Sequence, residues 1–245
     1  MSGHSKWANI KHRKGAQDAL RARQFTKAGR EIVVAAKAGG ADPNSNSRLR
    51  AAIAAARDIN MPKDKIERAI AKGAGEGGAE NYEEIVYEGR GPGGSAVFVN
   101  VLTDNRNRTT PEIRFLFNKY GGELGAPGSV AWMFDRKGRL TVAGGAVDEE
   151  RLLELVLEAG GDDVGFEEDH FEILTAPETF SHVREELEKA GVPVSSAEVA
   201  MIPKSLKTVE GKKAESLLAL LEALDNHDDV QKVAANCDIV TAPGA

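Results

Sequence analysis

The stretch GRLTVAGGAVDEERLLELVLEAGGDDVGFEEDHFEILTAPETFSHVREELEKAGVPVSSAEVAMIP at residues 138–203 decides the fold of this chain. Its apolar residues alternate where a strand is expected and recur every three or four positions where a helix is expected. The pattern predicts strand, helix, strand, strand, helix and strand, in that order, at residues 139–142, 149–159, 164–167, 171–174, 178–190 and 197–202. This β-α-β-β-α-β order is that of a ferredoxin-like domain, which we place at residues 137–203.

Similar patterns lie on both sides of that stretch. Before it, strands are predicted at residues 84–88, 96–103 and 130–134, with a helix that starts at Thr110 and Pro111. After it come a strand at residues 207–209, a Leu-rich helix and a last strand at 230–237. Counted without the insertion, these elements approximate a second β-α-β-β-α-β unit. The sequence therefore predicts a discontinuous α/β domain, residues 79–136 plus 204–245, which holds the ferredoxin-like domain in its middle.

The first 78 residues have a helical period instead. A long helix over residues 18–38 ends before two glycines, Ser47 is the expected N-cap of a second helix, and Pro62 opens a third that closes at Gly73. The mostly apolar stripe of the first helix consists of Leu20, Gln24, Ala28, Ile32 and Ala35. The predicted fold class is α+β and multidomain, with an N-terminal three-helix domain followed by two ferredoxin-like α/β domains, the last inserted in the middle one.

Charge is distributed unevenly between these parts. Residues 1–78, the head, hold 16 Lys and Arg against 7 Asp and Glu, a net charge of +9. The remaining 167 residues, the body, hold 16 against 31, a net charge of −15, and the whole chain has −6. Dense local cations attract polyanions whatever the overall charge, so this split predicts a nucleic-acid-binding head on an acidic body. The alternative is that the cations of the head only form a solvated helical face.

The first residues of the head form a basic arm. Residues 2–15 contain four Lys and Arg, no acidic residue and no clear apolar period. Such an arm orders on a phosphate backbone while Trp7 stacks on a base; alternatively, Trp7 anchors the arm to the first helix. With basic positions of the helices and of one turn in the body, the candidate nucleic-acid-binding residues are Lys6, Trp7, Lys11, His12, Arg13, Lys14, Arg21, Arg23, Lys27, Arg50, Arg57, Arg106 and Arg108.

The turn in the body has the sequence DNRNRTT at residues 104–110. Arg106 and Arg108 are expected just before a helix N-terminus, where backbone N–H groups and guanidinium groups together suit a phosphate. The alternative is a solvated turn in which Asp104 and Asn105 satisfy the local backbone.

Few residues support an enzyme. The chain has no nucleophile elbow, no Walker A loop and no histidine pair at helical ligand spacing. The GRGPGG loop at residues 89–94 matches a dinucleotide fingerprint by its letters, but a strand rather than a helix follows it. Glu167 and Glu168 are expected to point to opposite faces of a strand, so we expect a solvated acidic rim there, no metal and no cofactor. The rim consists of Asp162, Asp163, Glu167, Glu168 and Asp169 beside His170.

The amino-acid composition indicates in which cellular compartment the protein is expected. With 41% hydrophobic and 29% charged residues, the chain has enough apolar side chains for a core and no apolar run long enough to span a membrane. A single cysteine cannot form an internal disulfide, and the N-terminal residues lack the apolar region of a secretory signal. We therefore expect a cytoplasmic protein without membrane contact, either a monomer or a weak dimer.

Several motifs resemble those of one family. GHSKWANIKHRK at residues 3–14 is similar to its N-terminal signature, and residues 61–63 and 68–73 are similar to its third helix. Residues 87–94, LTDNRNRT at 102–109 and the glycine-rich segment up to residue 134 resemble its central signature. The chain is thus identified as a member of the YebC/PmpR family, which includes the mitochondrial translational activator of cytochrome c oxidase subunit I. The resemblance implies a helical N-terminal domain, two α/β domains around a cleft and a DNA-binding transcriptional regulator, with relatives that act on translating ribosomes.

The leading hypothesis is a non-enzymatic, nucleic-acid-binding regulator of gene expression that binds DNA and controls transcription. Within the same class, the alternative is a ribosome-associated factor that binds ribosomal RNA, because recognition of RNA shape requires fewer base-reading side chains. An alternative of another class is a protein–protein adaptor that works through its acidic body.

Replacing Lys11, Arg13 and Lys14 together with Ala is expected to weaken nucleic-acid binding broadly. Each phosphate that the variant no longer neutralises reduces the dependence of log affinity on log salt by about 0.7 to 0.9. Affinity titrations at several salt concentrations measure this slope. A slope equal to that of the unmodified chain would remove the arm from the interface.

Overall fold

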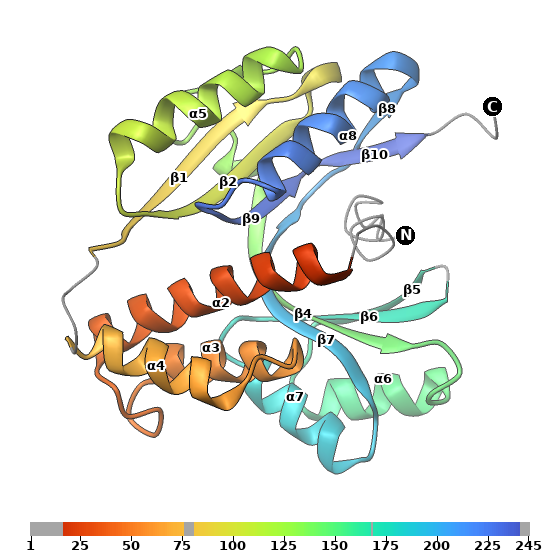
Figure 1. Cartoon of the computed structure of the whole chain (residues 1–245). Helices are drawn as coiled ribbons and strands as arrows, with labels where there is room; N and C mark the ends of the chain where they lie inside the picture. Colours follow the sequence, from red (N-terminus) through yellow and green to blue (C-terminus); the bar gives the residue numbers. More distant parts are fainter. Residues whose placement is uncertain (1–16, 76–80, 168, 241–245) are drawn as a thin grey trace. The chain divides into compact units, whose positions relative to one another are not determined.

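The computed structural model describes residues 17–75, 81–167 and 169–240 (Figure 1). These residues form two compact units. One is the continuous segment Phe134–Lys204, and the other combines the described residues before Phe134 with those after Lys204. The second unit therefore contains both the helices of the head and the outer part of the body.

Three helices form the described part of the head, as the sequence predicts. They are α2 (Gln17–Gly39), α3 (Ser47–Asp58) and α4 (Lys63–Gly73). Their common core is rich in small residues, and its larger buried members include Ile32, Leu49, Ile53 and Ile66. Gly73 lets α4 approach α2 closely, because a Cβ at this position would lie 2.6 Å from the carbonyl oxygen of Val33. The helices of the head thus share one core of their own.

The predicted apolar stripe of α2 is wrong at one of its four described side chains, and the side chain of Leu20 lies outside the described residues. Gln24 is exposed, and its neighbour Phe25 packs against the core instead. The prediction advanced by four residues at each step from Leu20 to Ile32, whereas an α-helix turns every 3.6 residues. A stripe with the true period passes through Phe25 before it reaches Ala28 and Ile32.

The N-cap of α3 is Asn46, not Ser47 as predicted. The Asn46 Oδ1 accepts a hydrogen bond from the backbone N of Leu49 at 3.0 Å. The Asn46 Nδ2 donates to the carbonyl oxygens of Ala35 and Gly40, at 2.8 Å each. Asn46 therefore caps α3 and ties it to the end of α2, so it is buried although it is polar.

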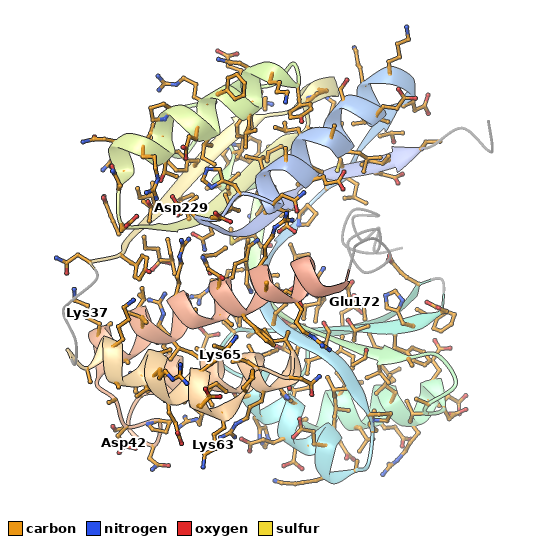
Figure 2. All side chains as sticks on the ribbon, in the orientation of Figure 1. Lys37, Asp42, Lys63, Lys65, Glu172 and Asp229 are labelled. Atoms are coloured by element: carbon orange, nitrogen blue, oxygen red, sulfur yellow. The ribbon has the colours of Figure 1, made fainter. Side chains whose placement is uncertain are left out.

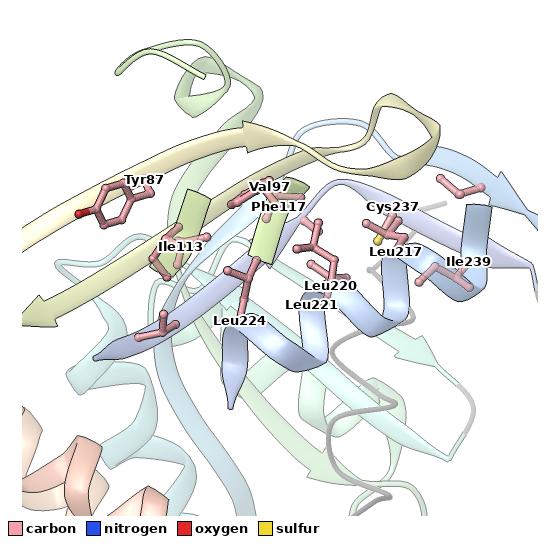
Figure 3. Close-up of a cluster of buried hydrophobic side chains, with 14 of the residues drawn as sticks. Tyr87, Val97, Ile113, Phe117, Leu217, Leu220, Leu221, Leu224, Cys237 and Ile239 are labelled. Carbon is pink, nitrogen blue, oxygen red and sulfur yellow. The ribbon is translucent and has the colours of Figure 1, made fainter. Parts of the chain in front are cut away.

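A four-stranded sheet with the order β3-β1-β2-β9 forms the outer part of the body. Neighbouring strands are antiparallel, and the strands are β1 (Glu83–Arg90), β2 (Ala96–Thr103), β3 (Glu123–Leu124) and β9 (Val230–Ala235). The loop between β1 and β2, which includes the short 3-10 turn Pro92–Gly94, makes the predicted hairpin. Helices α5 (Arg106–Lys119) and α8 (Gly211–Asp225) share one apolar core with the sheet (Figure 3).

The outer elements contain the predicted β-α-β-β-α-β order from β2 to β9, but a strand is added at each end and the strands do not pair as in a ferredoxin-like sheet. The elements follow each other as β1, β2, α5, β3, β8 (Lys207–Glu210), α8, β9 and β10 (Cys237–Val240), and β8 pairs with β10 in a separate parallel sheet. The expected last strand breaks at Asn236, whose Oδ1 accepts from the N of Ala96 at 2.6 Å. The carbonyl oxygen of Asn236 accepts from the N of Lys207 at 2.8 Å. The chain thus changes partner from β2 to β8 at this residue, which alternating hydrophobicity does not reveal.

The strand predicted at residues 130–134 is also wrong over most of its length. Ala131–Met133 form a 3-10 turn in which Trp132 is exposed, and a strand begins only at Phe134. The N–H groups of Val130 and Ala131 donate to the carboxylate of Glu88, at 2.8 and 2.7 Å. The buried carboxylate takes the hydrogen bonds that a neighbouring strand would otherwise accept.

The first unit follows the element order that its sequence predicts. Its elements are β4 (Phe134–Ala143), α6 (Glu149–Glu158), β5 (Asp163–Glu167), β6 (His170–Thr175), α7 (Phe180–Lys189) and β7 (Val194–Pro203). The strands form an antiparallel sheet with the order β5-β6-β4-β7. Leu140, Leu152 and Leu187 are fully buried members of the core that the two helices and the sheet share. Both units therefore contain antiparallel α/β sheets.

Asn46→Ala is expected to lower the free energy of unfolding of the head by roughly 1 to 3 kcal/mol, because it removes a helix cap and two buried hydrogen bonds. The matched control is Ser47→Ala, which removes the predicted but unused cap and should change stability by less than about 0.5 kcal/mol. Urea unfolding followed by circular dichroism compares the two variants. Equal effects of both substitutions would contradict the assignment of the cap.

Candidate nucleic-acid interface

The structure locates seven of the candidate residues. The six candidates of the arm, which are Lys6, Trp7, Lys11, His12, Arg13 and Lys14, lie outside the described residues. The others fall into three groups: Arg21, Arg23 and Lys27 lie on α2, Arg50 and Arg57 on α3, and Arg106 and Arg108 in the first turn of α5. Each group has a different set of partners.

Helix α2 presents a stripe of cations at positions i, i+4 and i+7, namely Arg23, Lys27 and Arg30, which we call the α2 stripe. It contacts the turn that follows α8, residues 225–229, which we call the anionic turn. Arg23 donates to the Oδ1 of Asn226, and the Nζ of Lys27 lies 2.7 Å from the carbonyl oxygen of Asp225. Sequence reasoning missed Arg30, although it continues the helical spacing of the two predicted residues.

Arg30 reaches the most buried carboxylate of the anionic turn. Its Nη1 lies 3.0 Å from the Oδ1 of Asp229 and also donates to the carbonyl oxygen of Asp228. The Asp229 side chain is only 3% exposed. No sequence motif marks this aspartate, because its partners come from distant parts of the chain.

The other oxygen of Asp229, which is labelled in Figure 2, is held by three donors. Its Oδ2 accepts from the hydroxyls of Thr103 at 3.1 Å and Thr109 at 2.6 Å, and from the Nη2 of Arg108 at 2.8 Å. Burial alone would raise the pKa of Asp229, but these hydrogen bonds and the charge of Arg30 outweigh it and hold the pKa below its usual range. The carboxylate is therefore ionised at neutral pH and joins β2, α5 and the anionic turn.

Arg106 and Arg108 do not precede the helix, as we predicted, but lie inside it. Helix α5 begins one turn earlier because Asn105 caps it, accepting from the N of Arg108 at 3.1 Å. Arg108 pairs with Asp104 at 3.0 Å in addition to Asp229, and the exposed Arg106 pairs with Glu83 at 3.1 Å. The buried carboxylate of Asp229 neutralises Arg108, whereas Arg106 forms only an exposed ion pair with Glu83.

The outer face of α3 differs because its cations have no carboxylate partner among the described residues. Arg50 and Arg57 are exposed and seven residues apart, so they lie on the same side of the helix. Arg50 donates only to the carbonyl oxygens of Pro43 and Asn44, at 3.0 and 3.3 Å. Arg57, like Arg21 on α2, has no hydrogen-bond or ion-pair partner within the described part of the chain. Both charges of this face remain available to an anion.

Helix α4 adds exposed cations that sequence reasoning did not select. Lys63 lies 3.5 Å from Glu67, and Arg68 pairs with Asp64 at 2.6 Å, both one turn apart on the helix. The Nζ of Lys65, a residue labelled in Figure 2, lies 5.1 Å from the centre of the Phe25 ring. Exposed pairs of this kind are weak, so they leave α4 only partly neutralised.

The central signature has a structural role in the body. Glu88 is buried and accepts from three backbone N–H groups, which hold its pKa below the usual range although burial opposes this. The hydroxyl of Tyr87 lies 2.5 Å from that of Thr110. Gly89 has no room for a side chain, since a Cβ would lie 2.5 Å from the ring of Phe117. These residues fix the loop before β4 and the position of α5.

The acidic side chains of the body do not gather into a metal site. Over residues 17–75, 81–167 and 169–240, no group of three or more His, Cys, Asp and Glu side chains is placed to hold a metal ion. Asp162, which the sequence places in the acidic rim, pairs with Lys137. None of the described helices is long and apolar enough to cross a membrane.

Asp229→Asn is expected to lower the free energy of unfolding at neutral pH by roughly 2 to 4 kcal/mol, because it leaves buried donors and two arginines without their carboxylate. A carboxylate whose pKa is lower in the folded than in the unfolded chain stabilises the fold fully at pH values above its pKa in the unfolded chain. This stabilisation is lost as the pH falls through its pKa in the folded chain. The difference between wild type and variant should therefore shrink below about pH 4. Urea unfolding at several pH values measures this.

The matched control is Asp228→Asn, since the Asp228 side chain is exposed and only its carbonyl oxygen contacts Arg30. It should change stability by less than about 0.5 kcal/mol. A variant difference that stays constant from neutral to acid pH would contradict the proposed ionised state of Asp229.

Similarity to known proteins covers nearly the whole chain. The model of the TACO1/YebC N-terminal domain matches residues 5–76, and that of the TACO1/YebC second and third domain matches residues 82–237. A probable transcriptional regulatory protein of Geobacter sulfurreducens is 57% identical over 98% of this chain and 97% of its own, and one of Carboxydothermus hydrogenoformans is 53% identical over 98% and 100%. The crystal structure of a conserved hypothetical protein from Aquifex aeolicus is 48% identical, with a TM-score of 0.88 over 98% of this chain and 99% of that one. Sequence motifs, fold and relatives therefore agree, and the chain belongs to the TACO1/YebC family.

Proposed function

We propose that this chain is a non-enzymatic regulator of gene expression that binds nucleic acid through its head. The names of its relatives support regulation of transcription, and the net charge of +9 on residues 1–78 supports binding to a polyanion. In this proposal the head works as a separate domain, and the match of a family model to residues 5–76 alone supports that division. Neither a cofactor nor a membrane takes part.

The observation that carries the proposal is the pair of cations on the outer face of α3. Arg50 and Arg57 are exposed and have no carboxylate partner in the described residues. Many other arginines are matched with acids, as Arg48 is with Glu31 at 2.8 Å. Cations that are not neutralised internally release the most free energy when they displace counterions from a phosphate backbone. We therefore assign the phosphate contact to the α3 face, extended by α4 and by the basic arm.

The acidic body has a complementary role in this proposal. Its net charge of −15 repels a phosphate backbone, so the nucleic acid approaches from the side of the head. The ion pair of Arg108 with the buried Asp229 makes a second phosphate site in that part of the body unfavourable. In this proposal, repulsion by the body and attraction to the head together set the orientation of the bound nucleic acid.

DNA is the proposed target, because the relatives are named as transcriptional regulators. Binding to ribosomal RNA by a translation factor is the competing outcome, since phosphate contacts alone do not distinguish the two polymers. Ultraviolet crosslinking in growing cells separates them. Reads at discrete promoters support the proposal, whereas reads at defined ribosomal RNA positions replace transcription with translation.

Arg50→Ala with Arg57→Ala is expected to weaken binding of both labelled duplex DNA and labelled single-stranded RNA. The slope of log affinity against log salt concentration should become shallower for each phosphate contact that is lost. The change per contact is about 0.9 on duplex DNA and about 0.7 on single-stranded RNA. Fluorescence anisotropy at several salt concentrations measures both. The matched control, Arg151→Ala with Lys189→Ala, removes two exposed cations from helices of the first unit. If the control reduced affinity as much as the α3 variant, the effect would be one of overall charge and the α3 assignment would be wrong.

A further inference from the structure

The α2 stripe and the anionic turn form a contact between two separately packed parts of the second unit. The core of the head and the core of the outer body share no residue. The contact between α2 and the turn is made by Arg23, Lys27 and Arg30 through hydrogen bonds and ion pairs. A contact built from charged groups depends on salt far more than an apolar interface does.

The anionic turn has the properties of a ligand for cations. It lies at the C-terminus of α8, where the last carbonyl groups carry the negative end of the helix dipole. The Nζ of Lys27 meets both the carbonyl oxygen of Asp225 at 2.7 Å and its carboxylate at 3.3 Å. The turn therefore offers the α2 stripe closely spaced oxygens with negative charge, as a phosphate backbone does.

The contact is only partly closed to water. The Lys27 and Asp225 side chains are each 18% exposed, and that of Arg30 is 17% exposed. A cavity of about 10 Å³ lies beside them, lined by Arg23, Thr26, Lys27, His227 and Asp228. Partly hydrated ion pairs contribute little stability individually, so a competing anion can replace them.

We propose that the α2 stripe is a second phosphate-binding surface of the head, which the anionic turn occupies in the free protein. A nucleic acid and the turn then compete for Arg23, Lys27 and Arg30, and full engagement of the head requires that α2 leave the turn. This inference rests on the proposed function, because it assumes that the head binds nucleic acid. It adds that the body limits this binding by presenting a substitute for the phosphate backbone.

Competition has a defined thermodynamic consequence. When only part of the population has a free α2 stripe, the apparent dissociation constant rises in proportion to the inverse of that fraction. Substitutions that weaken the contact between α2 and the anionic turn therefore strengthen nucleic-acid binding. Bound nucleic acid also weakens that contact, because the coupling is reciprocal. Asp229 remains bound to Thr103, Thr109 and Arg108 in either state, so the body keeps its fold.

The variant that tests this is Asp225→Lys with Asn226→Lys in the full chain. It places two cations opposite Lys27 and Arg23 without touching Asp229, and lysines suit the C-terminus of a helix. The matched control is Glu210→Gln with Glu215→Lys, which adds the same charge at the other end of α8. Both variants and the unmodified chain are titrated with labelled duplex DNA and single-stranded RNA over a range of salt concentrations.

The turn variant is expected to bind at least about threefold more tightly than the control. Its salt slope on duplex DNA should be steeper by up to about 2 to 3, since three cations are released for phosphate contacts. Affinity and slope equal to those of the control would overturn the competition while leaving the proposed function intact. If none of the three proteins bound either probe, the proposed function itself would fail.

A second measurement requires no substitution. Hydrogen exchange of the unmodified chain is followed with and without the same nucleic-acid probes. Residues 225–230 are expected to exchange faster in the complex, because α2 no longer covers the turn. Unchanged or slower exchange of these residues, in a sample where α3 becomes protected, would show that the nucleic acid binds without displacing the turn and would contradict the inference.

Discussion

The outer body depends on one buried carboxylate, that of Asp229, which is 3% exposed. A buried charge is tolerated only when donors replace the water that solvates it in the unfolded chain. Here the donors are Thr103, Thr109, Arg108 and Arg30, which belong to a strand, a helix and the head. Because Thr103, Thr109 and Arg108 all donate to this carboxylate from within the outer body, Asp229 fixes the corner between β2 and α5 and the path of the chain from α8 to β9.

The need for donors to the Asp229 carboxylate explains the structural role of the DNRNRTT segment at residues 104–110. Its two arginines and its position beside a helix start suggest an anion site, and an anion is indeed bound there in the form of carboxylates of the same chain. Asn105 caps the helix and Thr109 holds Asp229. The segment therefore contributes to the fold of the body, and Glu88 does the same for the loop that leads to β4.

The cations of the head likewise include some that are paired within the chain and some that face solvent. The α2 stripe faces carboxylates and carbonyl groups of the anionic turn, whereas Arg50 and Arg57 on α3 face solvent. In our proposals, the phosphate-binding surface of α3 is always open and that of α2 is occupied by the anionic turn. In our proposals the acidic body sets both the direction from which nucleic acid approaches and how much of the head it can use.

The sequence by itself determined the three helices of the head, the alternation of strands and helices in the body and the unequal charge of the two parts. These features depend on local periodicity and composition, which a single chain displays directly. The tertiary structure alone decided that Asn46 caps α3, that Asn236 divides the last strand between two sheets, and that the outer strands do not pair as those of the inserted unit do. It also decided which candidate cations are free, since the partners of Arg30 and Arg108 lie 199 and 121 residues away. An arginine that faces solvent and one that faces a buried aspartate look identical in the sequence. Only the folded chain brings the aspartate to the arginine.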